Sequence, residues 1–276
     1  MKVRIVADSS ANLLTAEDKG LVSVPLTIVT DHKEYVDNEH LDIKGMTDDL
    51  AVYKGRSGSA CPGTGDWLAA FGDADWVFGI TITSSLSGSY NAARVAQETY
   101  ENENPGKRVF IVDSLSAGPE LKVIVEMLQE LIESGKDFDG ICEEISAYQK
   151  KTGLSFVLKS LTNLANNGRV NPAIAKIAGV LGIQVVGIAS VHGELEQKEK
   201  VRGEKKALLS LYKSMKEQGF HGGKVRIDHC FNEEAAKELK SMVLDEFENA
   251  DVVIGINRGL CSFYAEPGGM LVGYEC

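Results

Sequence analysis

The feature that most constrains the fold is a repeated alternation of short apolar runs with longer helical patterns. In the first half of the chain, strand-like apolar runs occupy residues 3–7, 21–29, 76–83 and 108–112. Polar turn residues follow these runs, and helices are expected from about residue 11 and over 90–100, 121–134 and 138–152. Strands that alternate with helices predict an α/β architecture with a largely parallel sheet.

The pattern restarts after residue 150. Strands are expected at 155–158, 183–189, 193–201, 224–228, 251–256 and 270–274. Helices are expected from 161, stopping at 166–168, and over 171–181, 205–218 and 233–247. A chain of 276 residues also suggests two units at roughly 150 residues each. We therefore predict two α/β domains, 1–150 and 151–276, each with a mainly parallel sheet flanked by helices.

Charge and cysteine content narrow the class of protein. The net charge of -11 disfavours nucleic acid as a partner, because like charges repel. The five cysteines are odd in number and widely spaced, which predicts neither a disulfide framework nor a zinc site and fits a reducing, cytoplasmic compartment. The apolar tract 174–189 carries Lys176 and Gln184, so we expect buried core rather than a membrane helix. An acidic surface favours a monomer.

Signatures of catalysis or cofactor binding are missing from the sequence. It contains no phosphate-binding loop, no G-x-G-x-x-G after the first strand and no G-x-S-x-G nucleophile elbow. The five histidines lie far apart, and none has metal-ligand spacing. We therefore predict no catalytic residue, no metal and no cofactor.

Two segments are rich in hydroxyl groups and glycine. The first, 57–65, contains Ser59, and the second, 84–90, contains Ser85, Ser87 and Gly88. The second lies between an expected strand and an expected helix, where free N–H groups and serine hydroxyls can bind an anion. The alternative is ordinary helix capping in flexible turns.

A basic cluster stands out on this acidic chain. It comprises Lys198, Lys200, Arg202, Lys205 and Lys206. Such a run is commonly a solvated face, but it can also dock an acidic partner or a phosphate.

Residues 82–93 resemble the S-S-x-L-S-G-T-Y motif of the DegV family of bacterial fatty-acid-binding proteins. Weaker matches follow the family order along nearly the whole chain. They are the Asp-Ser strand ends at 6–9 and 112–114, the T-S-Q-P loop at 59–62, the L-x-K-G-G-R-I segment at 164–170 and the basic K-x-R-x-x-K-K-A stretch at 200–207.

The resemblance implies two α/β domains that enclose one long-chain fatty acid in an apolar tunnel between them. It places the carboxylate on the hydroxyls of Ser59 and Ser87, and Ser85 and Gly88 lie beside Ser87 in the second segment. It also assigns Arg169 to the carboxylate neighbourhood. Some members present the bound acid to a fatty-acid kinase and are carriers rather than catalysts, and Arg202 and Lys205 match the basic docking stretch.

The sequence departs from the family pattern at two places. Ala60 replaces the second hydroxyl of the T-S-Q-P loop, and Asn257 stands where many members have a histidine. Asparagine can donate a hydrogen bond to a carboxylate but carries no charge. We therefore keep Asn257 as a candidate ligand-binding residue.

Two rival functions remain open on the sequence. One is an enzyme that acts on an acyl or phosphorylated substrate with a loop serine as the nucleophile. The other is a binding protein for another small amphiphile. No base is recognisably placed near Ser59 or Ser87, which argues against the enzyme.

Overall fold

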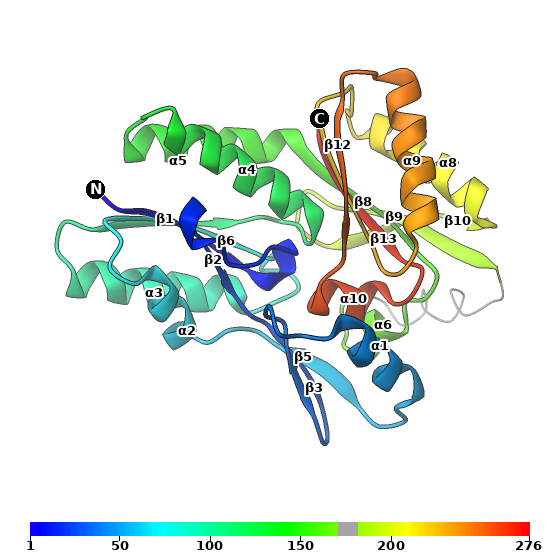
Figure 1. Cartoon of the computed structure of the whole chain (residues 1–276), viewed down its shortest axis with the longest axis horizontal. Helices are drawn as coiled ribbons and strands as arrows, with labels where there is room; N and C mark the ends of the chain where they lie inside the picture. Colours follow the sequence, from blue (N-terminus) through cyan, green and yellow to red (C-terminus); the bar gives the residue numbers. More distant parts are fainter. Residues whose placement is uncertain (171–181) are drawn as a thin grey trace.

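The computed structural model describes residues 1–170 and 182–276. The helix expected over 171–181 lies outside the described residues. The described chain forms a four-stranded sheet, a six-stranded sheet and a small three-stranded sheet, with helices between and around them (Figure 1). The α/β class expected from the sequence is confirmed.

The four-stranded sheet is entirely parallel, as predicted for the first half of the chain. Its strand order is β2-β1-β6-β7. The strands are β1 (Val3–Asp8), β2 (Leu21–Val24), β6 (Trp76–Thr81) and β7 (Arg108–Asp113). Alternate strand residues pack on α2 (Thr64–Phe71) and α3 (Ser89–Glu103) on one face, and on α4 (Pro119–Glu133) and α5 (Phe138–Tyr148) on the other.

The single strand expected over 21–29 is divided between two sheets. Pro25 follows β2, and proline cannot donate the N–H that would continue a central strand. The next strand, β3 (Thr27–Thr30), belongs to a small antiparallel sheet with β4 (Glu34–Val36) and β5 (Ser57–Ala60), beside α1 (Ile43–Val52). The segment 57–65 therefore begins as a strand and not as a loop.

The six-stranded sheet is mostly antiparallel, so the prediction of a mainly parallel second sheet was wrong. Its order is β10-β9-β8-β13-β11-β12, and only β11 and β12 run parallel. Its strands are β8 (Thr152–Leu158), β9 (Ile183–Ala189), β10 (Leu195–Arg202), β11 (Lys224–His229), β12 (Asp251–Ile256) and β13 (Met270–Glu275). A tight turn joins β9 to β10, and such turns connect only antiparallel neighbours.

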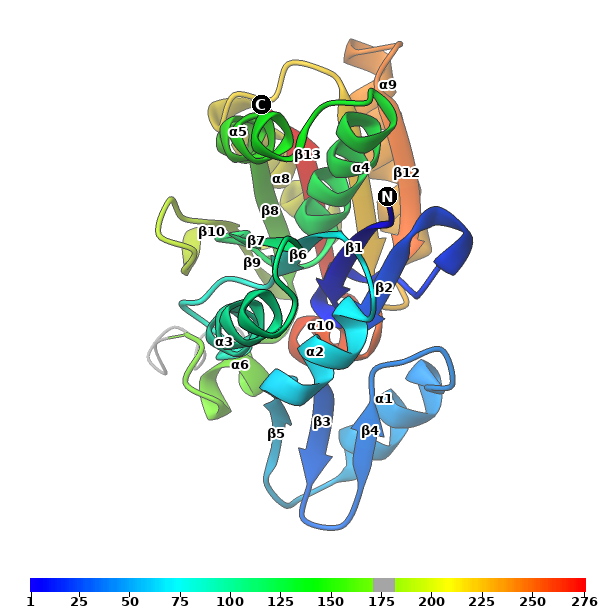
Figure 2. The same ribbon diagram turned by 90° about the vertical axis from the view of Figure 1, so that its left-hand side faces the viewer.

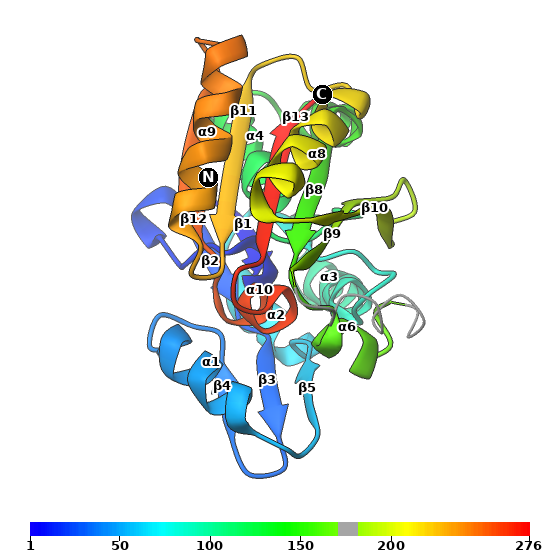
Figure 3. The same ribbon diagram turned by 90° about the vertical axis from the view of Figure 1, so that its right-hand side faces the viewer.

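The two faces of the six-stranded sheet have different neighbours. One face packs on α8 (Glu204–Glu217) and α9 (Glu233–Glu246), which form the largest apolar core with it. Two short helices, α6 (Thr162–Asn166) and α10 (Gly259–Ala265), lie near the junction of the three sheets (Figures 2 and 3). Single 3-10 turns occur at Ser9–Ala11, Glu17–Lys19 and Gln149–Lys151. The helix expected to begin near residue 11 is absent, because the first of these turns ends there and Asn12 has a left-handed backbone conformation.

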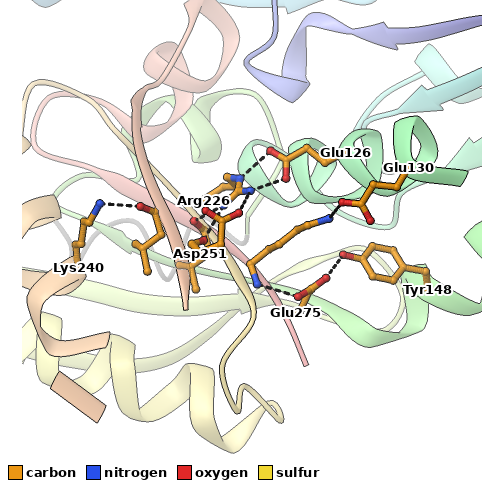
Figure 4. A network of polar contacts seen from close by, with 10 residues as sticks. Glu126, Glu130, Tyr148, Arg226, Lys240, Asp251 and Glu275 are labelled. Carbon is orange, nitrogen blue, oxygen red and sulfur yellow. Dashed lines mark hydrogen bonds and ion pairs between the residues drawn. The ribbon is translucent and has the colours of Figure 1, made fainter. Parts of the chain in front are cut away.

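Helix α4 joins the two large sheets. Its apolar side packs on the parallel sheet, whereas its charged side faces β11. Arg226 donates to both carboxylate oxygens of Glu126 at 2.7 and 2.6 Å and also pairs with Asp251, while Lys224 pairs with Glu130 at 2.5 Å (Figure 4). Because α4 packs on both sheets, it couples the two parts of the chain, and the division near residue 150 stays a prediction.

A glycine permits the close approach at the start of α4. A Cβ atom added to Gly273 of β13 would lie 2.2 Å from the backbone nitrogen of Glu120. Any side chain at this position would push the helix off the sheet. None of the described helices has both the length and the apolar composition that a membrane crossing requires.

Candidate functional site

An apolar cavity lies where the three sheets meet. Its wall is formed by one face of the six-stranded sheet, by α10 and by the segments that follow β2 and β6. The lining residues are Leu26, Ser59, Ile82, Leu86, Ser87, Ala117, Leu154, Phe156, Leu158, Leu164, Arg169, Leu195, Leu260, Cys261, Tyr264, Ala265 and Leu271. Most of them are aliphatic or aromatic, which suits the hydrocarbon part of a ligand.

Strand alternation produces the apolar wall. Leu154, Phe156 and Leu158 occupy every second position of β8, so their side chains share one face of the sheet. Leu271 of β13 pairs with Phe156 and adds to the same face. A Cβ atom on Gly187 would lie 2.3 Å from the Phe156 ring, so the glycine provides the space that this ring occupies.

The polar groups of the cavity are few. Ser59 Oγ and the Tyr264 hydroxyl are hydrogen-bonded to each other at 2.8 Å. Ser87 Oγ accepts a long hydrogen bond from the backbone N–H of Ser89 at 3.3 Å, so its own proton can be donated elsewhere. Arg169 supplies the one charged side chain among the described lining residues. Hydroxyl groups and a guanidinium together suit a carboxylate.

Three segments that are far apart in the sequence converge around these groups. The Nε of Arg169 donates to the backbone oxygen of Leu86 at 3.3 Å, which ties the segment after α6 to the loop after β6. A Cβ atom on Gly88 would lie 3.3 Å from the sulfur of Cys61, so that loop also touches the end of β5. The convergence brings Ser59, Ser87 and Arg169 to one cavity.

A buried carboxylate holds the loop that carries Ser87. Asp8, at the end of β1, accepts hydrogen bonds from the Ile82 N–H at 2.9 Å and the Ser89 hydroxyl at 2.7 Å. Burial raises the pKa of Asp8, and the hydrogen bonds oppose that rise. Asp8 thus fixes both ends of the loop without lining the cavity.

A second buried carboxylate orients α10. Asp37 accepts hydrogen bonds from the backbone N–H groups of Gly259 and Leu260 at 2.8 and 2.9 Å. These are the first residues of the helix that carries Tyr264. Burial raises the pKa of Asp37. Its position at the helix N-terminus satisfies donors that have no partner within the helix.

Three of the site candidates from the sequence do not line the cavity. Ser85 donates to the backbone oxygen of His192 at 2.7 Å, and Gly88 is exposed before the first turn of α3. Asn257 is fully buried, and its side-chain oxygen accepts from Asn12 at 3.1 Å. Asn257 therefore takes part in a buried polar contact with Asn12 and does not face the cavity.

Sequence reasoning missed Tyr264. No helix or strand is expected from the sequence between the strand at 251–256 and the strand at 270–274. The structure forms α10 from this segment, and the helix turns Tyr264 toward Ser59. An aromatic residue with a polar tip in a short apolar helix was the available signal.

The basic candidates lie on a different part of the surface. Arg202 ends β10, and Lys205 lies in the first turn of α8; both are exposed. Neither is among the residues that line the cavity. Any role for them therefore concerns a partner at the surface and not direct contact with a ligand inside.

The lining residues do not form a hydrolytic site. Within 1–170 and 182–276, the cavity lining includes no His, Asp, Glu or Lys that could take a proton from a serine. No group of three or more His, Cys, Asp or Glu in those ranges could hold a metal ion. The arrangement can bind a molecule that has one anionic end and one long apolar part.

The fold and the cavity define the class as an α/β binding protein for a ligand with an anionic end and a long apolar part. A family model described as an uncharacterised protein of the DegV family matches residues 2–275. A DegV domain-containing protein of Streptococcus gordonii is 40% identical, with 100% of this chain and 99% of that protein covered. The chain belongs to the DegV family.

Solved structures of the family are closely similar. A DegV family protein from Eubacterium eligens, loaded with heptadecanoic acid, is 46% identical with a TM-score of 0.96, and 99% of each chain is covered. The Streptococcus pneumoniae fatty acid kinase B3 protein, loaded with linoleic acid, is 41% identical with a TM-score of 0.96, covering 100% of this chain and 99% of that chain.

Proposed function

We propose that this protein binds one long-chain fatty acid and presents its carboxylate to a fatty-acid kinase. The observation that carries the proposal is the cavity, which is apolar along β8 and has Ser59, Ser87, Tyr264 and Arg169 as its polar groups. The two similar structures with bound fatty acids support the same ligand class. The protein is a carrier and not itself a catalyst.

The energetics of the cavity fit this ligand. Each methylene that leaves water contributes up to about 0.8 kcal/mol, so a long chain supplies ample affinity. The carboxylate must exchange its water for other donors, because a buried charge without partners is costly. The hydroxyls of Ser59 and Ser87 and the guanidinium of Arg169 are the proposed donors.

Lipid analysis of the purified protein tests the ligand. Native mass spectrometry should detect one fatty acid per chain, and solvent extraction of the denatured protein should release roughly one equivalent, since an enclosed apolar cavity retains its ligand. A different amphiphile of the same stoichiometry would support the second rival function. Preparations without lipid, whose melting temperature does not rise with added fatty acid, would contradict the proposal.

The partner surface is proposed at Arg202 and Lys205. Lysine in the first turn of α8 opposes the helix dipole, so its position is not explained by helix stability. Reversing the charge of both residues should slow phosphorylation of the bound acid roughly tenfold at low salt and leave lipid binding unchanged. Kinase turnover that responds to neither the charge reversal nor added salt would assign the cluster to a solvated face.

The cellular setting is proposed as cytoplasmic and the protein as a monomer. All five cysteines are free, which suits a reducing compartment. The strong net negative charge favours separate molecules in solution.

A further inference from the structure

A second cavity lies beyond the apolar one. Its lining mixes polar and apolar residues from the β7–α4 connection, the start of β8 and the end of β9. They are Ser114, Leu115, Glu120, Gln149, Lys150, Thr152, Gly153, Leu154, Ala189, Ser190, Val191, Gln218 and Cys276. Val191 is 83% exposed, so this cavity opens to the surface.

Leu154 is the described residue that lines both cavities. Its side chain is 2% exposed, and it pairs with Gly273 at the point where the start of α4 lies against β13. Neighbouring Ala117 lines the apolar cavity, whereas Glu120 lines the second one. The boundary between the two spaces therefore passes through Leu154 and the first turn of α4.

Among the lining residues of β8, Leu154 is the one furthest along the chain from α6, the helix that Arg169 follows. Leu158 precedes α6, and Arg169 follows that helix with its N–H bonded to the Leu164 oxygen at 2.8 Å. Leu154 is four residues back along β8, which is about 13 Å in an extended strand. A chain whose carboxylate lies near Arg169 and which runs along β8 would end against Leu154.

We propose that Leu154 sets the upper limit of acyl-chain length by closing the cavity where the ligand's methyl end lies. This inference rests on the proposed function and specifies which acyl-chain lengths the same site accepts. A chain longer than the cavity cannot place its last methylenes in apolar surroundings. Shortening Leu154 joins the two spaces, and Leu115, Ala189 and Val191 then offer apolar contacts to the extended chain.

Competition between hexadecanoic and docosanoic acid tests the proposal. The wild-type protein should prefer the shorter acid. Leu154→Ala should shift the ratio of dissociation constants toward docosanoic acid by at least roughly fourfold, the value of one additional buried methylene. Leu154→Val should shift it less in the same direction and replaces the alanine variant if thermal unfolding shows that variant to be unfolded.

Leu158→Ala is the matched control. Leu158 lies on the same strand face, is equally buried and lines only the apolar cavity. It should weaken binding of both acids by a similar factor and leave their ratio unchanged. A wild-type ratio in both Leu154 variants, or an equal shift in Leu158→Ala, would overturn the proposal. Wild-type protein that binds neither acid would instead contradict the proposed function, and the length limit would fall with it.

Discussion

The parallel and the antiparallel sheet contribute to the cavity in different ways. The parallel sheet contributes the loops beyond its carboxyl ends, where Asp8 holds the segment that carries Ser87. The antiparallel sheet contributes one face, to which Leu154, Phe156 and Leu158 of β8 supply apolar side chains. Loops at the carboxyl ends of parallel strands can bring polar groups together, whereas the face of a sheet provides apolar surface area. We therefore assign orientation of the ligand to the parallel sheet and burial of its apolar part to the antiparallel sheet.

The largest expected effect comes from the wall. Phe156→Ala removes a ring that is 3% exposed and packs over Gly187, so the unfolding free energy of the lipid-free protein should fall by about 3 kcal/mol or more. Urea unfolding measures this change after delipidation, because bound ligand would stabilise the native state. Ser87→Ala is the control and should change stability by less than about 0.5 kcal/mol. Equal losses of unfolding free energy in both variants would contradict the different roles assigned to the face of the antiparallel sheet and to the loops of the parallel sheet.

A pH effect is expected where the two sheets meet. Burial raises the pKa of Glu120 from 4.5 to about 7, although Ser116 and Thr152 donate to its carboxyl group. Between these values the native state holds a proton that the unfolded state has lost, so stability falls as the pH rises through this range. The fall attributable to Glu120 is on the order of 3 kcal/mol.

Glu120→Gln tests that assignment because glutamine does not titrate. Unfolding free energies measured from pH 4.5 to 8 should decline less steeply in the variant than in the wild type. The stability of the variant relative to the wild type should therefore be greatest at neutral pH and above. Parallel pH profiles would mean that Glu120 does not hold the proton.

The smallest effect is expected from Tyr264. Tyr264→Phe keeps the ring in the cavity and removes only the hydroxyl that bonds Ser59. One such hydrogen bond is worth about 0.5–1.5 kcal/mol, so fatty-acid affinity should fall roughly threefold to tenfold. Titration calorimetry with one fatty acid measures it. Loss of all binding would place Tyr264 among the main carboxylate donors instead of behind Ser59.

Local sequence patterns predicted elements better than they predicted pairings. The strand at 251–256 and the helix at 233–247 follow from periodicity, and β12 and α9 lie there. Periodicity contains no information on which strand lies beside which, so the antiparallel neighbours of β13 could not be predicted. The sequence does mark the break between β2 and β3, because Pro25 cannot continue a central strand.

The candidate site was predictable in part for a similar reason. Ser59, Ser87 and Arg169 lie in segments whose composition or family resemblance singled them out, and they line one cavity. Phe156 and Tyr264 lie in ordinary apolar segments, and only the folded sheet reveals which face meets the cavity. Asn257 occupies a position known from the family pattern, but in this structure its side chain is buried and accepts a hydrogen bond from Asn12.

The central claim is that Ser59 and Ser87 hold the carboxylate of a bound fatty acid. The most direct measurement is the dissociation constant of one long-chain fatty acid, and of the alcohol of equal length, for the wild type and for the Ser59→Ala, Ser87→Ala double variant. A hydrogen bond to a charged group is worth about 1.5–3 kcal/mol, so the acid should bind at least roughly tenfold more weakly to the variant. The alcohol should lose much less, because it carries no charge. Unchanged affinity for the acid in the double variant would contradict the account.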